Sequence, residues 1–180
     1  MSFVEKKLNE QTLYEGKVFT VRTATVELPD GNQATRDSIE HHGGAAILPL
    51  DDEGNIYLVR QYRFGIGREL LEIPAGKLEP GEDPKETAYR ELTEEIGFKP
   101  GKLISLGPME LSPAYLSEII HLYLAEDLIP CAAPKDEDEF IEVVKMPFTE
   151  ALEMVLNNTL TDAKTQATIL KTYILLNNKE

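Results

Sequence analysis

The chain has 180 residues, of which 42% are hydrophobic and 28% are charged, a composition typical of one folded domain and not of a disordered chain, a collagen or a coiled coil. The chain has 18 Lys and Arg residues and 32 Asp and Glu residues, which gives a formal net charge of −14. Such an acidic surface repels nucleic acid and anionic lipid. A single cysteine, Cys131, excludes an intrachain disulfide and is typical of a reducing compartment.

The apolar runs of the chain are short. None approaches the ~20 residues that a membrane span needs. Residues 1–10 carry neither the apolar core of a signal peptide nor an Arg-rich amphipathic pattern. We therefore expect a soluble, cytoplasmic protein with neither a membrane nor a nucleic acid among its partners.

The first forty-odd residues predict a small antiparallel sheet. Residues 17–28 are rich in β-branched side chains, which is typical of a strand. A turn is predicted at Pro29-Asp30-Gly31-Asn32, so residues 35–40 are expected to return as a hairpin partner. The composition changes near residue 43, just after a break at His41-His42-Gly43-Gly44. We therefore expect residues 1–43 to form a region of their own.

Residues 44–180 predict strands with helices between them. Apolar runs at 45–50 and 56–61 are joined by a hairpin loop, Asp51-Asp52-Glu53-Gly54-Asn55. Further strands are predicted at 70–73, 103–111, 119–124 and 140–146, and helices at about 84–96, 149–157 and 162–177. This order favours an α/β class with a mixed sheet and helices on its faces over a doubly wound parallel fold.

The most informative predicted helix lies within residues 76–98, GKLEPGEDPKETAYRELTEEIGF. Asp83 suits the N-cap and Pro84 the first helical position. Gly97 can end the helix in the left-handed conformation. At helical spacing, three hydrophobic side chains form the expected buried stripe: Tyr89, Leu92 and Ile96.

Three carboxylates, those of Glu91, Glu94 and Glu95, share another face of this helix. Like charges at such spacings destabilise an isolated helix by about 0.2–0.5 kcal/mol per pair. A solvated acidic face is one interpretation. A site for a hard divalent cation is the other, because such cations prefer carboxylate oxygens. Arg90 can pair with Glu82, which lies just before the helix, and so fix the preceding loop.

The segment 76–98 resembles the Nudix box, the signature of the Nudix hydrolases. All nine specified positions match: Gly76, Glu82, Arg90, Glu91, Leu92, Glu94, Glu95, Gly97 and Phe98. The resemblance implies an α/β/α sandwich with a mixed β-sheet, formed by a catalytic domain over 44–180, beside the small N-terminal antiparallel sheet of 1–43. It also implies hydrolysis of a nucleoside diphosphate linked to another moiety.

The same resemblance implies roles for individual residues. Mg²⁺, for which Mn²⁺ can substitute, would neutralise phosphate charge and activate water. The implied metal ligands are Glu91, Glu95, the carbonyl of Ala75, and Glu139. Glu137 is the implied general base on a mobile loop, and Glu94 and Arg90 complete the catalytic set. From the residues alone, the acidic run 136–139 could equally be a solvated turn.

Several stretches outside the box resemble bacterial ADP-ribose pyrophosphatases. They are residues 14–19, 59–63, 71–77, Ser112-Pro113, Glu118, 136–140 and 162–165. The resemblance implies Pro113 as a marker of that branch. It assigns Arg63 to a phosphate, through two parallel hydrogen bonds, and Glu118 to a ribose hydroxyl or the adenine amine. Phe19 and Arg22 are candidates to stack on adenine.

The expected reaction is Mg²⁺-dependent hydrolysis of ADP-ribose to AMP and ribose 5-phosphate. Two alternatives stay open, namely a pyrophosphatase with a broader substrate range, such as GDP-mannose or NADH, and a non-catalytic ADP-ribose sensor. His41-His42-Gly43-Gly44 and Ala114 depart from the pattern of the relatives, so substrate preference is less firmly implied than reaction type. The resemblance also implies a homodimer whose N-terminal sheet crosses to the partner; a sheet packed on its own core is the alternative.

Overall fold

The computed structural model describes residues 2–132 and 140–178, and its contacts divide the chain into two compact units. The first unit comprises Met1–Gly43 together with Glu110–Ile119. The second comprises Gly44–Met109 and Ile120–Glu180. Among the described residues no helix is long and apolar enough to cross a bilayer.

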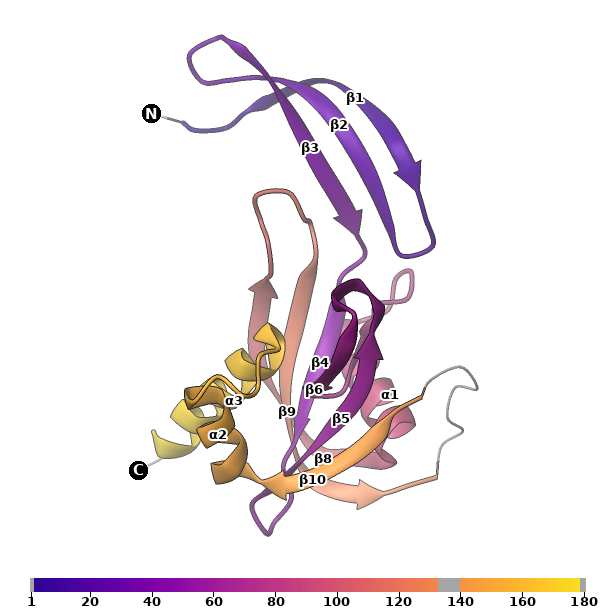
Figure 1. Ribbon diagram of the computed structural model, residues 1–180, viewed down its shortest axis with the longest axis vertical. Helices are drawn as coiled ribbons and strands as arrows, with labels where there is room; N and C mark the ends of the chain where they lie inside the picture. Colours follow the sequence, from indigo (N-terminus) through magenta and orange to yellow (C-terminus); the bar gives the residue numbers. More distant parts are fainter. Residues whose placement is uncertain (1, 133–139, 179–180) are drawn as a thin grey trace. The chain divides into compact units, whose positions relative to one another are not determined.

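The first unit contains an antiparallel sheet of three strands in the order β1-β2-β3 (Figure 1). Its strands are β1 (Lys6–Glu15), β2 (Phe19–Glu27) and β3 (Gln33–His41). The predicted hairpin is confirmed, because the Gly31 amide donates to the Leu28 carbonyl and Gly31 adopts a φ of +87°, which favours glycine. Strand β1 was not predicted, since polar residues interrupt its hydrophobic pattern.

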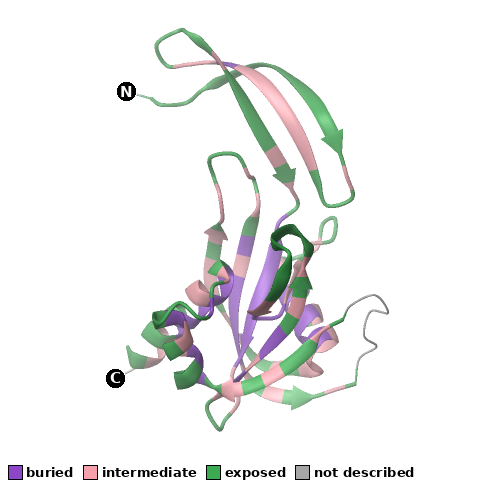
Figure 2. Cartoon of the chain, viewed as in Figure 1, coloured by how far each residue is buried: buried purple, intermediate pink, exposed green. Residues whose placement is uncertain are grey.

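This sheet has little core of its own. All ten residues of β1 are exposed, and Val26 is the one buried hydrophobic residue among the described residues of the first unit (Figure 2). A small sheet gains stability mainly from packing a hydrophobic face. The exposed β1 therefore leaves apolar side chains, such as Leu8 and Leu13, in contact with solvent.

The second unit holds two sheets and the long helices. One sheet has the order β7-β4-β9-β8, in which β4 pairs antiparallel with β7 and parallel with β9. The other has the antiparallel order β10-β5-β6. The bounds are β4 (Gly44–Pro49), β5 (Asn55–Arg63), β6 (Arg68–Glu72), β7 (Ala75–Lys77), β8 (Phe98–Glu110), β9 (Ile119–Pro130) and β10 (Glu142–Pro147). The predicted α/β class with a mixed sheet is confirmed.

Helices flank these sheets within the second unit (Figure 1). They are α1 (Pro84–Glu91), continued by a π-helical turn η2 (Leu92–Ile96), α2 (Phe148–Leu156) and α3 (Ala163–Asn177); a short 3₁₀ turn, η1 (Phe64–Ile66), follows β5. The helices predicted at 149–157 and 162–177 are confirmed. The continuous helix predicted for 84–96 instead widens into the π-helical turn after Glu91.

Helix α1 packs on the central strand β4, whose six residues are all buried. Ala88 and Leu92 join Ala45 and Ile47 in the core. The predicted stripe was wrong at Tyr89, which is 40% exposed. The small side chain of Ala88 lets the helix approach the sheet closely, so the contact lies along Ala88 and Leu92 and leaves Tyr89 beside it.

We predict opposite sensitivities for the two helix positions that the sequence placed on one stripe. Leu92→Ala removes a fully buried side chain and should lower the free energy of unfolding by about 2–5 kcal/mol. Tyr89→Ala should change it by less, about 1 kcal/mol, because Tyr89 is already 40% exposed. Urea unfolding of both variants checks this, and equal losses would contradict the packing of α1.

Candidate active site

The segment 76–98 places its helix by local signals that the sequence predicted. The Asp83 carboxylate accepts a hydrogen bond from the Lys85 amide at 2.8 Å, and Pro84 begins α1. Gly97 ends the π-helical turn with a φ of +79°. A π-helical turn inside an α-helix is frequent at functional sites, and this one carries Glu94 and Glu95.

The glycine loop before the helix touches the helix carboxylates. A Cβ built on Gly76 would overlap the carboxylate of Glu91, so only glycine permits this approach. One residue earlier, the Ala75 amide lies 3.3 Å from Glu95 Oε2, to which it donates a hydrogen bond. The backbone of the loop and two carboxylates of the helix therefore meet at one place.

Two of the three helix carboxylates are buried. Glu91 is 7% exposed and Glu95 is 3% exposed. A buried carboxylate is costly unless hydrogen bonds and opposite charges compensate it. A solvated acidic face is therefore not what the structure has; these charges are held inside the molecule.

Arg90 supplies much of the compensation. Its Nη1 donates to Glu91 Oε1 at 2.7 Å and to Glu94 Oε2 at 3.0 Å, and its Nε donates to Glu82 Oε1 at 3.1 Å. The predicted pairing of Arg90 with Glu82 is therefore present. Burial disfavours the charge of Arg90, but the three carboxylates outweigh burial and raise the pKa of the guanidinium. The hydrogen bond from Arg90 lowers the pKa of Glu82 to about 2.

The residues at this place fit a hard divalent cation. Within the part of the chain that the structure describes, no three His, Cys, Asp or Glu side chains form a complete metal cage. Mg²⁺ does not need such a cage, because it binds through one or two carboxylates and otherwise uses waters and substrate phosphates. Glu91 and Glu95 could supply those carboxylates, with the carbonyl of Ala75 as a further oxygen. Glu137 and Glu139, the other two predicted acidic residues, lie outside the described residues.

Arg63 makes its two parallel hydrogen bonds to a protein carboxylate. Its Nε donates to Glu72 Oε1 at 2.7 Å and its Nη2 donates to Glu72 Oε2 at 3.0 Å. Glu72 is buried and also binds Lys164. Burial raises the pKa of Glu72, but the bonds and charges of the two cations outweigh burial and lower it. Sequence reasoning missed Glu72 and Lys164 as members of this charged cluster. A glutamate inside the apolar run 70–73 was a usable signal for the first of them.

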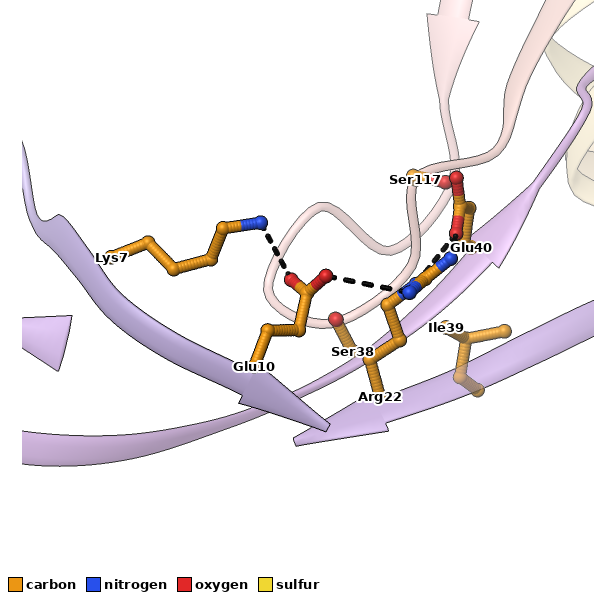
Figure 3. A pocket seen from close by; sticks show the side chains of 7 residues that line it. All are labelled: Lys7, Glu10, Arg22, Ser38, Ile39, Glu40 and Ser117. Atoms are coloured by element: carbon orange, nitrogen blue, oxygen red, sulfur yellow. Dashed lines mark hydrogen bonds and ion pairs between the residues drawn. The ribbon is translucent and has the colours of Figure 1, made fainter. Parts of the chain in front are cut away.

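Phe19 and Arg22 lie in the first unit. Phe19 packs at a ring-centroid distance of 6.0 Å against Tyr14. Arg22 Nε donates to Glu40 at 2.7 Å, and its Nη1 lies 3.4 Å from Glu10. These charged side chains line a hollow of about 320 Å³, in which the dashed lines of Figure 3 trace the ion pairs.

Pro113 and Glu118 also lie in the first unit. Pro113 is exposed in a turn, where the Ser112 carbonyl accepts hydrogen bonds from the Tyr115 and Leu116 amides. Glu118 Oε1 lies 3.4 Å from His41 Nδ1, which in turn accepts from the Gly43 amide at 3.0 Å. His41 is thus part of the local structure of this loop.

Two family models match the chain. The NUDIX domain matches residues 40–171, and the nucleoside diphosphate sugar hydrolase N-terminal domain matches residues 5–39. The chain belongs to the Nudix hydrolase family. The resemblance found in the segment 76–98 is therefore confirmed.

Individual relatives are similar over nearly the whole chain. An ADP-ribose pyrophosphatase of Bacillus subtilis (strain 168) is 41% identical over 166 residues, which cover 91% of this chain and 90% of the relative. A methanol dehydrogenase activator of Bacillus methanolicus is 39% identical over 165 residues, covering 91% and 89%. The crystal structure of an ADP compounds hydrolase has a TM-score of 0.85 at 24% identity and covers 97% of this chain and 95% of its own, which shows a shared fold.

The low pKa of Glu82 predicts how its contribution to stability depends on pH. A carboxylate whose pKa is lower in the folded than in the unfolded protein stabilises the fold above its unfolded value of about 4.3. That contribution is lost as the pH falls toward 2. We predict that Glu82→Gln lowers the free energy of unfolding at pH 6 by up to about 3 kcal/mol. At pH 3 the difference in this free energy between the variant and the unaltered chain should be smaller.

Urea unfolding at pH 6, 4 and 3 measures this gap. Glu86→Gln, in the exposed first turn of the same helix, is the matched control. If the difference in unfolding free energy between Glu82→Gln and the unaltered chain stays constant over this pH range, the assigned ion pair with Arg90 is contradicted.

Proposed function

We propose that this chain hydrolyses the pyrophosphate bond of ADP-ribose to AMP and ribose 5-phosphate in the presence of Mg²⁺. The observation that carries the proposal is the pair of buried carboxylates, Glu91 and Glu95, held against the loop of Ala75 and Gly76. The 41% identity to an ADP-ribose pyrophosphatase supports the choice of substrate.

In this proposal the carboxylates of Glu91 and Glu95 and the Ala75 carbonyl hold the metal, and Glu139 adds a ligand. When bound, Mg²⁺ neutralises charge on the phosphate oxygens and lowers the pKa of the attacking water. Arg90 holds the carboxylates of Glu91 and Glu94 in place.

The remaining roles follow the same scheme. The water oxygen bonds to one phosphorus, and Glu137 accepts the proton of the water. The bond from that phosphorus to the bridging oxygen breaks, and the other phosphate leaves with the bridging oxygen. Glu94 lies beside the metal ligands on the π-helical turn. Arg63 contacts a phosphate through Nη1, since Glu72 occupies its Nε and Nη2.

For the nucleoside half of the substrate, the proposed roles follow the family resemblance. Phe19 and Arg22 both line a second hollow of the N-terminal sheet, beside the turn between β1 and β2, and are candidates to stack on adenine. Glu118 is a candidate to accept hydrogen bonds from the ribose or the adenine amine. Pro113 marks the loop that carries Glu118.

A second candidate is hydrolysis of a different nucleoside diphosphate derivative, such as GDP-mannose or NADH. The surroundings of Glu118 favour it, because Glu118 Oε1 lies 3.4 Å from Nδ1 of His41, a residue of the segment 41–44 that departs from the pattern of the relatives.

We further propose a homodimer in which the N-terminal sheet contacts the partner subunit. Two observations support this, since exposed apolar surface marks interaction sites. Strand β1 is fully exposed, and Val26 is the single buried hydrophobic residue among the described residues of its unit. Analytical ultracentrifugation would give twice the mass of the chain, and a monomer at micromolar concentration would refute the dimer.

The single cysteine, Cys131, suits a reducing, cytoplasmic location.

A product assay tests the proposed reaction. With Mg²⁺ present, ADP-ribose, GDP-mannose and NADH are compared at equal concentration, and we predict AMP chiefly from ADP-ribose and no product after chelation. Preference for another nucleotide would contradict the substrate assignment alone. Tight binding without turnover of any of them would contradict the enzymatic proposal and favour an ADP-ribose sensor.

Glu91→Gln and Glu95→Gln test the metal assignment. Each should fold and lose activity by about 100-fold or more, because even partners outside the ligand shell commonly contribute 10–100-fold. Glu86→Gln on the same helix is the control and should keep its activity. Unchanged turnover in Glu91→Gln and Glu95→Gln would remove the two carboxylates from the metal site.

Glu137→Gln and Glu139→Gln test the assignment of the base. Glu137→Gln should bind ADP-ribose with nearly unchanged affinity and turn it over about 100-fold more slowly or worse. Single-turnover kinetics with excess enzyme separates binding from chemistry. A far larger loss of the chemical step in Glu139→Gln would exchange the two roles.

A further inference from the structure

A buried charged cluster at the start of α3 has no part in the reaction scheme above. Asp162 caps the helix, and its Oδ2 accepts from the Thr165 amide at 3.0 Å and from Thr165 Oγ1 at 2.6 Å. The Lys164 ammonium lies 3.0 Å from Asp162 Oδ2 and also donates to Glu72 Oε2. Lys164, Thr165 and Glu72 are all buried.

Stability alone is a poor explanation for this cluster. A lysine in the first turn of a helix is disfavoured by the helix dipole. Replacing a buried ion pair with apolar residues of similar volume is often neutral or stabilising, because both charges lose their hydration when buried. Lys164 is therefore placed where a plain core would more readily take an apolar residue.

The cluster fixes Glu72 in place through its backbone as well as its carboxylate. The amide of Ile73, the next residue, donates to Thr165 Oγ1 at 2.9 Å in a buried hydrogen bond. The Pro74 carbonyl then accepts from the Ile47 amide on β4 at 2.9 Å. Glu72 is thus held by α3 on one side and leads directly into the loop of the candidate active site.

Glu72, held in this way, in turn fixes the position of Arg63. Its two oxygens take Nε and Nη2 of the guanidinium, a paired geometry that fixes the plane and direction of the group. The Arg63 side chain is still 41% exposed, and Nη1 has no hydrogen-bond partner among the described residues. One edge of the guanidinium is therefore anchored and the other is left for an anion.

Lys164 also affects the charge that Arg63 presents. With Lys164 present, the negative charge of Glu72 is shared between two cations, so it cancels less of the charge of Arg63. Without Lys164, Glu72 would neutralise Arg63 more completely, which weakens the attraction of Arg63 for a phosphate.

We propose that Glu72 and Lys164 are positioning residues that aim Arg63 at a phosphate of the substrate and preserve its positive charge. This inference rests on the proposed function, in which Arg63 contacts a phosphate. Neither residue touches the substrate, so both act through Arg63.

A double-mutant cycle tests the proposal. Lys164→Met and Arg63→Gln are each expected to raise KM for ADP-ribose by about 10-fold with a smaller change in kcat. The double variant should match Arg63→Gln alone, because Lys164 has no route to the phosphate once Arg63 is gone. Lys171→Met, which removes the same charge from an exposed position of α3, is the matched control and should leave KM unchanged.

Binding of inorganic pyrophosphate, measured by calorimetry without metal, is the second readout. It should weaken in Lys164→Met and not weaken further in the double variant. If the unaltered chain does not hydrolyse ADP-ribose, the proposed function fails, and the same cycle measured with pyrophosphate still decides the positioning role.

Glu72→Gln, which keeps the shape of the side chain, replaces Lys164→Met if the latter does not fold. It removes the paired acceptor that fixes Nε and Nη2 of Arg63, so it should raise KM when Arg63 is present and have no further effect in the Arg63→Gln background. Effects of Lys164→Met and Arg63→Gln that multiply in the double variant would overturn the proposal, as would an unchanged KM together with unchanged pyrophosphate affinity.

Discussion

The candidate active site depends on burying carboxylates that would otherwise repel one another. Glu91 and Glu95 lie against a loop that only glycine lets come so close, and an ionised carboxylate in such a place needs compensation. Arg90 provides it by bridging Glu91 and Glu94 to Glu82. Removing this guanidinium would take away an opposite charge that compensates the buried carboxylates.

A buried carboxylate compensated by cations also occurs in the cluster of Glu72, Arg63 and Lys164 in the second unit. There Glu72 is the buried carboxylate, and Arg63 and Lys164 are the cations around it. In the first centre one cation holds several carboxylates, which suits a site that attracts a metal ion. In the second, two cations share one carboxylate, which suits a site that attracts a phosphate. A nucleoside diphosphate and its metal require both kinds of surroundings.

Local signals made much of this predictable from the sequence. The cap at Asp83, the left-handed Gly97 and the pairing of Arg90 with Glu82 all involve residues close together in the chain, so spacing alone determines them. The family resemblance then assigned the chemistry. The assignments of Glu137 and Glu139 remain predictions that rest on that resemblance.

The rest depended on tertiary packing. Helical spacing placed Tyr89 on one stripe with Leu92 and Ile96, whereas the contact with β4 runs through the small Ala88. Lys164 and Glu72 are 92 residues apart, and no local pattern links them. Strand β1 has an exposed, polar sequence, and it forms because β2 offers a pairing edge. Such features follow from neighbours that a single sequence does not reveal.

The central claim is that the buried carboxylates and the glycine loop form a metal site. Crystals of the protein soaked with Mn²⁺, with diffraction recorded at the manganese absorption edge, test it most directly. The account predicts anomalous density bounded by the carboxylates of Glu91 and Glu95 and the carbonyl of Ala75. Manganese bound at other residues, with this place still empty at saturating concentration, would contradict it.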